Sequence, residues 1–206
     1  MYIPRFYEEK DWNEIEQLIR EFGFAILVSA QNQVPIATHV PLELSKNESG
    51  DWILVGHISR ANQQCKNFDN HSTLMAIFTG PHAYVSPSWY NHKNVPAWNY
   101  KAVHVYGKAR IMEGEERIKA LSKMMDRYEH LHAANPTKIE EVPDSILEGD
   151  FRGLVAFEIK IERFEAASKL SQNRDAESYQ TVIDNLKTSD SYDSKRIAEE
   201  MEKRKK

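Results

Sequence analysis

The chain has little cysteine, no long apolar run and little net charge. Cys65 is the single cysteine among 206 residues, so no intramolecular disulfide can form, which fits a reducing cytoplasm. No apolar run approaches the length that a bilayer-spanning helix needs. Residues 1–6 lack the basic and apolar regions of a secretory signal. We therefore expect a soluble cytoplasmic protein with no membrane partner.

The sequence also lacks the motifs of several enzyme classes. It has no paired-histidine zinc motif, no serine-nucleophile elbow and no phosphate-binding loop for ATP. We therefore assign no metal ligands and no catalytic residues. A hydrophobic content of 41% and a charged content of 28% are typical of a globular chain, and the length allows one sizeable core.

A direct DNA-binding surface is also hard to find in the sequence. The net charge is −4, and no helix-turn-helix pattern occurs. The strongest basic segment is the C-terminal tail, where glutamates are interspersed among Lys195, Arg196, Lys203, Arg204, Lys205 and Lys206. Such a tail is more often a solvated, salt-bridged helix than a DNA-binding arm.

Hydrophobic periodicity predicts a mainly β chain. Asp11 is placed to cap a helix over residues 12–22, and Gly23 is placed to end it. After that the pattern alternates, as strands do. The predicted strands are 24–30, 35–44, 52–58, 73–79, 83–86, 99–112 and 151–161; the predicted helices are 60–68, 115–132 and 177–186, with a tail helix from 194.

Short hairpin connections between these strands favour an antiparallel barrel or sandwich with helices packed outside. The fold class is thus mainly β with peripheral helices. We expect residues 1–165 to form a barrel domain with an N-terminal helix and inserted helices. Residues 166–206 then form a polar loop and a helical tail.

The junction at residues 57–63 is a candidate anion site. An apolar strand ends there, and Ser59 is expected to cap the helix that begins at Arg60. The first N–H groups of a helix and an arginine both favour a phosphate, and Asn62 and Gln63 add neutral donors. The alternative is an ordinary helix cap beside a solvated arginine.

Four further segments carry polar or aromatic groups of interest. Thr38 and His39 interrupt an apolar strand, either as ligand-lining residues or with His39 as a core histidine satisfied by a carbonyl. The stretch 78–90 is dense in aromatic residues, which suit a flat heterocycle but also suit a self-packed loop. Along strand 99–112, side chains such as Tyr100 and His104 share one face, which we expect to meet a partner subunit or a ligand. The segment 169–174 supplies polar donors, for which ordinary loop chemistry is the alternative.

In this order, these segments resemble the PaiB family of bacterial transcriptional regulators. The resemblance is carried by residues 24–107 and 169–174, most specifically by the segments 80–90, 98–107 and 169–174. The layout is also similar to the wider FMN-binding split-barrel superfamily, which includes pyridoxine phosphate oxidases and flavin reductases. The chain departs from the family pattern at Gln63 and Cys65, where members tend to carry proline and tryptophan.

The resemblance implies a split β-barrel that binds FMN at a homodimer interface. It implies that Ser59 and Arg60 contact the FMN phosphate and that the strand carrying His104 lies between the subunits. It further implies negative regulation of sporulation and protease genes, through DNA directly or through another regulator. The predicted cofactor-binding residues are Thr38, His39, Val40, His57, Ser59, Arg60, Asn62, Gln63, Trp98, Tyr100, Lys101, His104, Lys169, Ser171 and Gln172.

An FMN-dependent oxidoreductase or flavin reductase with an unidentified substrate is the alternative. In that case the flavin would carry the redox chemistry and the protein would supply orientation and donors. The sequence favours a non-enzymatic role because no residue pattern identifies a substrate.

Overall fold

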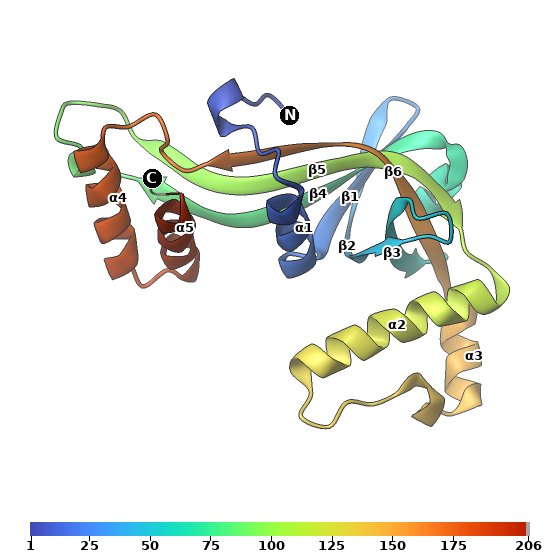
Figure 1. Cartoon of the computed structure of the whole chain (residues 1–206). Coiled ribbons are helices and arrows are strands. Elements are labelled where there is room, and N and C mark those ends of the chain that lie inside the picture. Colours follow the sequence, from blue (N-terminus) through green and yellow to red (C-terminus); the bar gives the residue numbers. More distant parts are fainter. Residues whose placement is uncertain (205–206) are drawn as a thin grey trace. The chain divides into compact units, whose positions relative to one another are not determined.

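The described residues of the computed structural model form a closed barrel of antiparallel strands, in the spatial order β1-β2-β3-β6-β5-β4 (Figure 1). The model describes residues 1–204, apart from the side chains of Gln31, Asn70, Glu148 and Asp150. The predicted fold class is therefore confirmed. The strands are β1 Phe24–Gln31, β2 Val34–Lys46, β3 Trp52–Ser59, β4 Asp69–Val85, β5 Ala97–Ile111 and β6 Leu154–Lys169.

Helices precede, interrupt and follow the strands along the chain. Among residues 1–204, no helix is both long and apolar enough to cross a membrane. The α-helices are α1 Trp12–Glu21, α2 Gly114–His132, α3 Asp144–Gly153, α4 Ala176–Thr188 and α5 Tyr192–Lys203; the short 3₁₀ helices are η1 Arg5–Tyr7, η2 Gln63–Asn67, η3 Pro87–Trp89 and η4 Ile139–Glu141.

Local chemistry explains the first helix and the first hairpin. The Asp11 side chain accepts a 2.9 Å hydrogen bond from the Asn13 amide, which caps α1 as predicted. The helix buries one apolar stripe. In the β1–β2 hairpin, Asn32 and Gln33 adopt left-handed backbone angles with φ of 51° and 66°, as a tight two-residue turn requires. The predicted strands 24–30, 35–44, 52–58 and 99–112 and the predicted helices after residues 115 and 177 are all confirmed within a few residues.

The chain forms two compact units. Unit 1 holds residues 1–22, 78–104 and 165–206, and unit 2 holds residues 23–77 and 105–164. In unit 1, α4 and α5 lie side by side and bury Val182, Ile183 and Met201 in a shared core (Figure 1). In unit 2, Ile53 and Leu121 belong to a separate buried cluster. The predicted division at residue 165 stays a prediction.

The strands β4 and β6 differ from the predictions in their boundaries. β4 runs unbroken through Gly80, where the pattern indicated two strands. A Cβ atom at Gly80 would lie only 3.0 Å from the Lys101 carbonyl oxygen, so this glycine permits close strand approach and does not mark a turn. The predicted strand 151–161 is wrong at its start because residues 151–153 end α3, a helix that the pattern did not predict. It is also wrong at its end, because β6 continues to Lys169 where a polar loop was expected.

Candidate functional site

The junction after β3 is a turn and not the start of a helix. Ser59 is the last residue of β3, and its carbonyl accepts a 2.9 Å hydrogen bond from the Asn62 amide. Asn62 then caps η2 by accepting a 2.9 Å bond from the Gln64 amide. The prediction of a helix over 60–68 capped by Ser59 is therefore wrong. The side chain of Asn62, three residues after Ser59, serves as the cap, and only the short 3₁₀ helix Gln63–Asn67 follows.

Arg60 lies exposed in this turn with its guanidinium held in place. Its Nε donates to the Arg152 carbonyl at 2.9 Å, and its Nη2 donates to the Leu154 carbonyl at 3.1 Å. Both acceptors are neutral, and within the described chain no carboxylate forms an ion pair with Arg60. The positive charge is therefore positioned by the backbone and left available for an anion.

A second contact brings β2 to the same junction. The Asn62 side-chain amide donates a 2.9 Å hydrogen bond to the Thr38 hydroxyl, so two predicted site residues from distant segments lie together. Next to Thr38, Val40 is buried in the barrel wall. His39 is exposed and stacks on Phe24 with ring centroids 6.1 Å apart, so the alternative of a buried core histidine is excluded.

His57 lies on β3, two residues before Ser59. Its imidazole is half-buried, and burial lowers its pKa. The buried Nδ1 atom has no hydrogen-bond partner among the residues that the structure describes. Gln63, by contrast, is exposed and accepts a 2.7 Å bond from Lys66. A neutral imidazole with an unpartnered nitrogen is suited to bonding a ligand.

These groups in unit 2 fit the phosphate end of FMN. The guanidinium of Arg60 carries an uncompensated charge, the Ser59 hydroxyl lies beside it in sequence, and the His57 imidazole offers an unpartnered nitrogen. Hydrogen bonds of this kind to an anion are charge-assisted and strong. Cys65 also lies near Arg60, but burial raises the pKa of its thiol and keeps it neutral.

The remaining predicted residues lie in unit 1, several of them on β5. Trp98 is exposed and meets the Tyr84 ring edge-on at 5.9 Å. Tyr100 and His104 are half-buried on the same face of the strand. Burial lowers the pKa of His104, the N-terminal amine lowers it further and Glu165 opposes both. The His104 Nδ1 atom, like that of His57, is buried with no partner in the described structure.

Lys101 occupies the opposite face of β5 and is almost fully buried. Its ammonium lies 2.8 Å from a Glu14 carboxylate oxygen and 2.5 Å from a Glu200 oxygen. This charge on a central strand therefore has internal partners on α1 and α5. The predicted contact between Lys101 and a cofactor stays a prediction, and the structure assigns the side chain to this ion-pair cluster.

The segment 169–174 is held by its own hydrogen bonds. The Ser171 hydroxyl donates to the Asn99 side-chain oxygen at 3.0 Å, and Ser171 adopts a left-handed backbone with φ of 61°. The Gln172 side chain accepts from the Leu170 amide at 2.7 Å. Lys169 places its ammonium 5.8 Å from the centre of the Tyr7 ring. Cofactor contacts by Lys169, Ser171 and Gln172 stay predictions.

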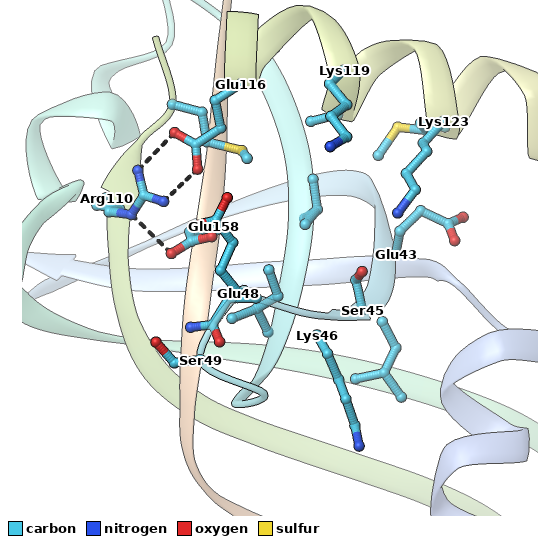
Figure 2. Close-up of a pocket in the computed structure, with 17 residues that line it drawn as sticks. Glu43, Ser45, Lys46, Glu48, Ser49, Arg110, Glu116, Lys119, Lys123 and Glu158 are labelled. Atoms are coloured by element: carbon cyan, nitrogen blue, oxygen red, sulfur yellow. Dashed lines mark hydrogen bonds and ion pairs between the residues drawn. The ribbon is translucent and has the colours of Figure 1, made fainter.

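A cavity of about 800 Å³ in unit 2 was not predicted (Figure 2). It lies between α2, the end of β2 and the β2–β3 turn. On one side Arg110 pairs with Glu116 at 2.5 Å and with Glu158 at 2.8 Å, and these partners raise its pKa. One sequence signal accompanies the cavity, namely the charged residues at helical spacing on α2, a pattern that usually indicates a solvated face.

The antiparallel barrel and a family match together define an FMN-binding barrel class of protein. A family model described as "Putative FMN-binding domain" matches residues 1–163 of the chain. A Bacillus subtilis (strain 168) protein named "Protease synthase and sporulation protein PAI 2" is 39% identical over 202 residues, covering 98% of this chain and 97% of its own length. The chain therefore belongs to the FMN-binding domain family, and the predicted membership of the PaiB family is confirmed.

More distant relatives and solved structures agree with this fold. An uncharacterised Emericella nidulans protein, AN0679, is 27% identical over 84% of each chain. An FAD- and haem-binding protein from Mycobacterium smegmatis matches with a TM-score of 0.60 at 13% identity, over 84% of this chain and 78% of its own. The flavocytochrome Anf3 from Azotobacter vinelandii has the same TM-score at 16% identity, over 87% and 78%. At such identities the likeness concerns the fold. FMN as the cofactor is supported by the family.

Proposed function

We propose that this protein is a cytoplasmic, homodimeric FMN-binding regulator that represses sporulation and protease genes. The family match supports the flavin. The printed name of the Bacillus subtilis relative, which aligns over almost the whole length of both chains, supports the biological process. A reducing compartment is consistent with the lone Cys65.

The observation that carries the flavin part is the state of Arg60. Two backbone carbonyls hold its guanidinium, and none of the described carboxylates neutralises it. In the proposal Arg60, Ser59 and Asn62 hold the phosphate of FMN, and Thr38 and His57 lie beside them. When bound, the flavin supplies one- or two-electron redox chemistry. The chain's own part is to position the phosphate and to retain a neutral His57.

The proposed dimer rests on the outward face of β5 in unit 1. Tyr100, Ala102 and His104 are half-buried there, whereas Asn99 and Lys101 on the other face are buried. Exposed Trp98 adds apolar area to this face. Aromatic residues are enriched at protein interfaces, so this face is suited to a second copy of the chain.

The charges of the C-terminal helix favour regulation through another protein over direct DNA contact. Arg196 pairs with Glu21 and Glu199, and Lys203 pairs with Glu200. Arg204 pairs with Glu9. Lys205 and Lys206 lie outside the described residues. Binding to DNA is driven by protein cations that displace the counterions of the DNA phosphates. Cations that already pair with carboxylates of the protein displace few of them, so a strong electrostatic contact with DNA is not expected.

An absorbance spectrum of the purified full chain, before and after addition of FMN, tests the flavin part. A bound flavin with a shifted spectrum supports the proposal, and a protein that stays colourless after incubation with FMN overturns it. Light scattering with and without FMN tests the dimer. Riboflavin, which lacks the phosphate, serves as the control ligand.

The regulatory part is tested by gel-shift titration on promoter fragments across a salt series. A shift at low salt that fades steeply with added salt indicates direct contact. If the promoter fragment shifts only when a cell extract fraction is added and not with the protein alone, the protein acts through another regulator. Turnover of a bound flavin with NADH and an acceptor would instead support the oxidoreductase alternative.

A further inference from the structure

The cavity beneath α2 has the size of a small-molecule site and is separate from the residues predicted for flavin. Its volume of about 800 Å³ lies within the range of roughly 300–1,000 Å³ that is common for ligand pockets. None of the predicted cofactor-binding residues lines it. Its walls belong entirely to unit 2, and Figure 2 shows side chains from α2 and from the β2–β3 region facing each other across it.

The floor of the cavity is apolar. It is lined by side chains that are nearly buried: Leu44 and Ile53 of the β2–β3 hairpin, Met112 just before α2, and Met124 on α2. Methionine is flexible and polarisable, so it adapts to ligands of different shape. Such a floor favours an apolar ligand body, because contact removes apolar surface from water.

Three of the four carboxylates of the walls have a cationic partner within the protein. Glu43 pairs with Arg127 at 2.6 Å, and Glu116 and Glu158 both pair with Arg110. Glu48, exposed on the β2–β3 turn, is the remaining acidic group of the rim. Because Arg110 serves two carboxylates, Arg110 and Arg127 leave the four wall carboxylates with two net negative charges, which the lysines around the cavity offset.

The cations of the cavity are placed differently. Lys119 and Lys123 lie one helical turn apart on α2, and their ammonium groups point into the cavity (Figure 2). Across the described part of the chain, neither lysine forms an ion pair. Lys46 lies on the opposite side, with its ammonium 4.7 Å from the Trp52 ring centre. The cations without an ion-pair partner are thus three exposed lysines around the cavity, two of which lie on α2.

We propose that this cavity binds an amphipathic monocarboxylate, with its carboxylate between Lys119 and Lys123 and its apolar body on the floor formed by Leu44, Ile53, Met112 and Met124. The two ammonium groups supply charge-assisted hydrogen bonds to the carboxylate. The apolar body supplies most of the buried area, and the ligand links α2 to the β2–β3 hairpin.

Calorimetric titration of the full chain with decanoate tests the proposal. We expect saturable binding with one decanoate per chain. The double substitution Lys119→Gln and Lys123→Gln should weaken this binding at least tenfold. The matched control, Lys93→Gln with Lys195→Gln, removes two exposed lysines of unit 1 and should leave it unchanged. Decan-1-ol, with the same chain and no charge, should bind at least tenfold more weakly than decanoate.

A second variant separates ligand binding from loss of folding. Ala120→Trp fills the cavity from α2 and should abolish decanoate binding while the circular dichroism spectrum and FMN titration stay as in the parent. Three results would each overturn the proposal. The parent does not bind decanoate, or it binds decan-1-ol as tightly as decanoate. The third is that the double lysine variant or Ala120→Trp binds decanoate as tightly as the parent. A change of mass with Ala120→Trp in light scattering, without decanoate binding to the parent, would assign the cavity to a second copy instead.

Discussion

The side-chain amide of Asn62 donates a 2.9 Å hydrogen bond to the hydroxyl of Thr38. The same asparagine uses its side-chain oxygen to accept a 2.9 Å bond from the Gln64 amide. One side chain therefore caps η2 and joins it to β2. Beneath it, the fully buried Gln64 donates to the Leu27 carbonyl at 3.0 Å, which ties the turn to the barrel.

Replacing Asn62 should destabilise this end of the barrel. Asn62→Ala removes a cap and leaves the Thr38 hydroxyl without its partner, which together should cost about 1–2 kcal/mol of unfolding free energy. Urea unfolding monitored by fluorescence measures this as a lower midpoint with an unchanged slope. Gln63→Ala, at an exposed neighbour, is the control and should stay within about 0.5 kcal/mol of the parent.

Arg60 should contribute to the binding of the FMN phosphate and not to the binding of the flavin ring. Arg60→Ala removes the uncompensated guanidinium and should weaken FMN binding by about 1.5–3 kcal/mol, since a charge-assisted bond is lost. Flavin fluorescence titration measures the change. Riboflavin should bind the parent and the variant about equally, and Arg5→Ala, at an exposed arginine of unit 1, should leave FMN affinity unchanged. Equal FMN affinity of the parent and Arg60→Ala would remove Arg60 from the site.

Local patterns in the sequence predicted most of the elements. Alternation of apolar residues identified the long strand that became β5, and Asp11 identified the start of α1, because both signals act between near neighbours in the sequence. The same logic failed at residues 59–62. Ser59 and Asn62 are both good cap residues, and only the surrounding hydrogen bonds decide which of them serves.

Properties that depend on distant segments could not be predicted. Gly80 interrupts the apolar pattern of β4, yet the strand continues through it. The glycine is needed there because the backbone of Lys101, on a different strand, approaches closely. Lys101 is predicted to contact a cofactor, and no local pattern reveals its ion-pair partners Glu14 and Glu200, which come from opposite ends of the chain. The cavity under α2 needs the β2–β3 hairpin and a helix that begins at Gly114. No local pattern brings such groups together.

Gly107 should tolerate no side chain. A Cβ atom there would overlap the Lys160 carbonyl oxygen and lie 2.8 Å from Cγ2 of Ile159. Because backbone is the obstacle, Gly107→Ala should cost at least about 2 kcal/mol of unfolding free energy. Gly149→Ala is the control, since nothing lies within 4 Å of that position and alanine favours its helix. Thermal unfolding should show a clear drop for the first variant and none for the second.

Glu200 should make stability depend on pH in the acid range. Burial by itself raises the pKa of Glu200, but the hydrogen bonds and charges of Lys101 and Lys203 outweigh it and hold the pKa below its ordinary value. A folded-state pKa below the unfolded value of about 4.3 gives stability that is fully present above that value. This stability is lost as the pH falls through the folded-state pKa.

Glu200→Gln should therefore lower the unfolding free energy by about 3 kcal/mol at pH 7, because it leaves Lys101 buried with only Glu14 as a partner. The difference from the parent should shrink steadily as the pH falls below about 4.3, because the parent carboxylate then becomes protonated. Urea midpoints measured at several pH values check this. Glu199→Gln, at an exposed neighbour paired with Arg196, should change stability by less than about 0.5 kcal/mol at every pH. Parallel curves for the parent and Glu200→Gln down to pH 3 would mean that this carboxylate does not titrate with unfolding, and that the cluster stabilises the fold by packing alone.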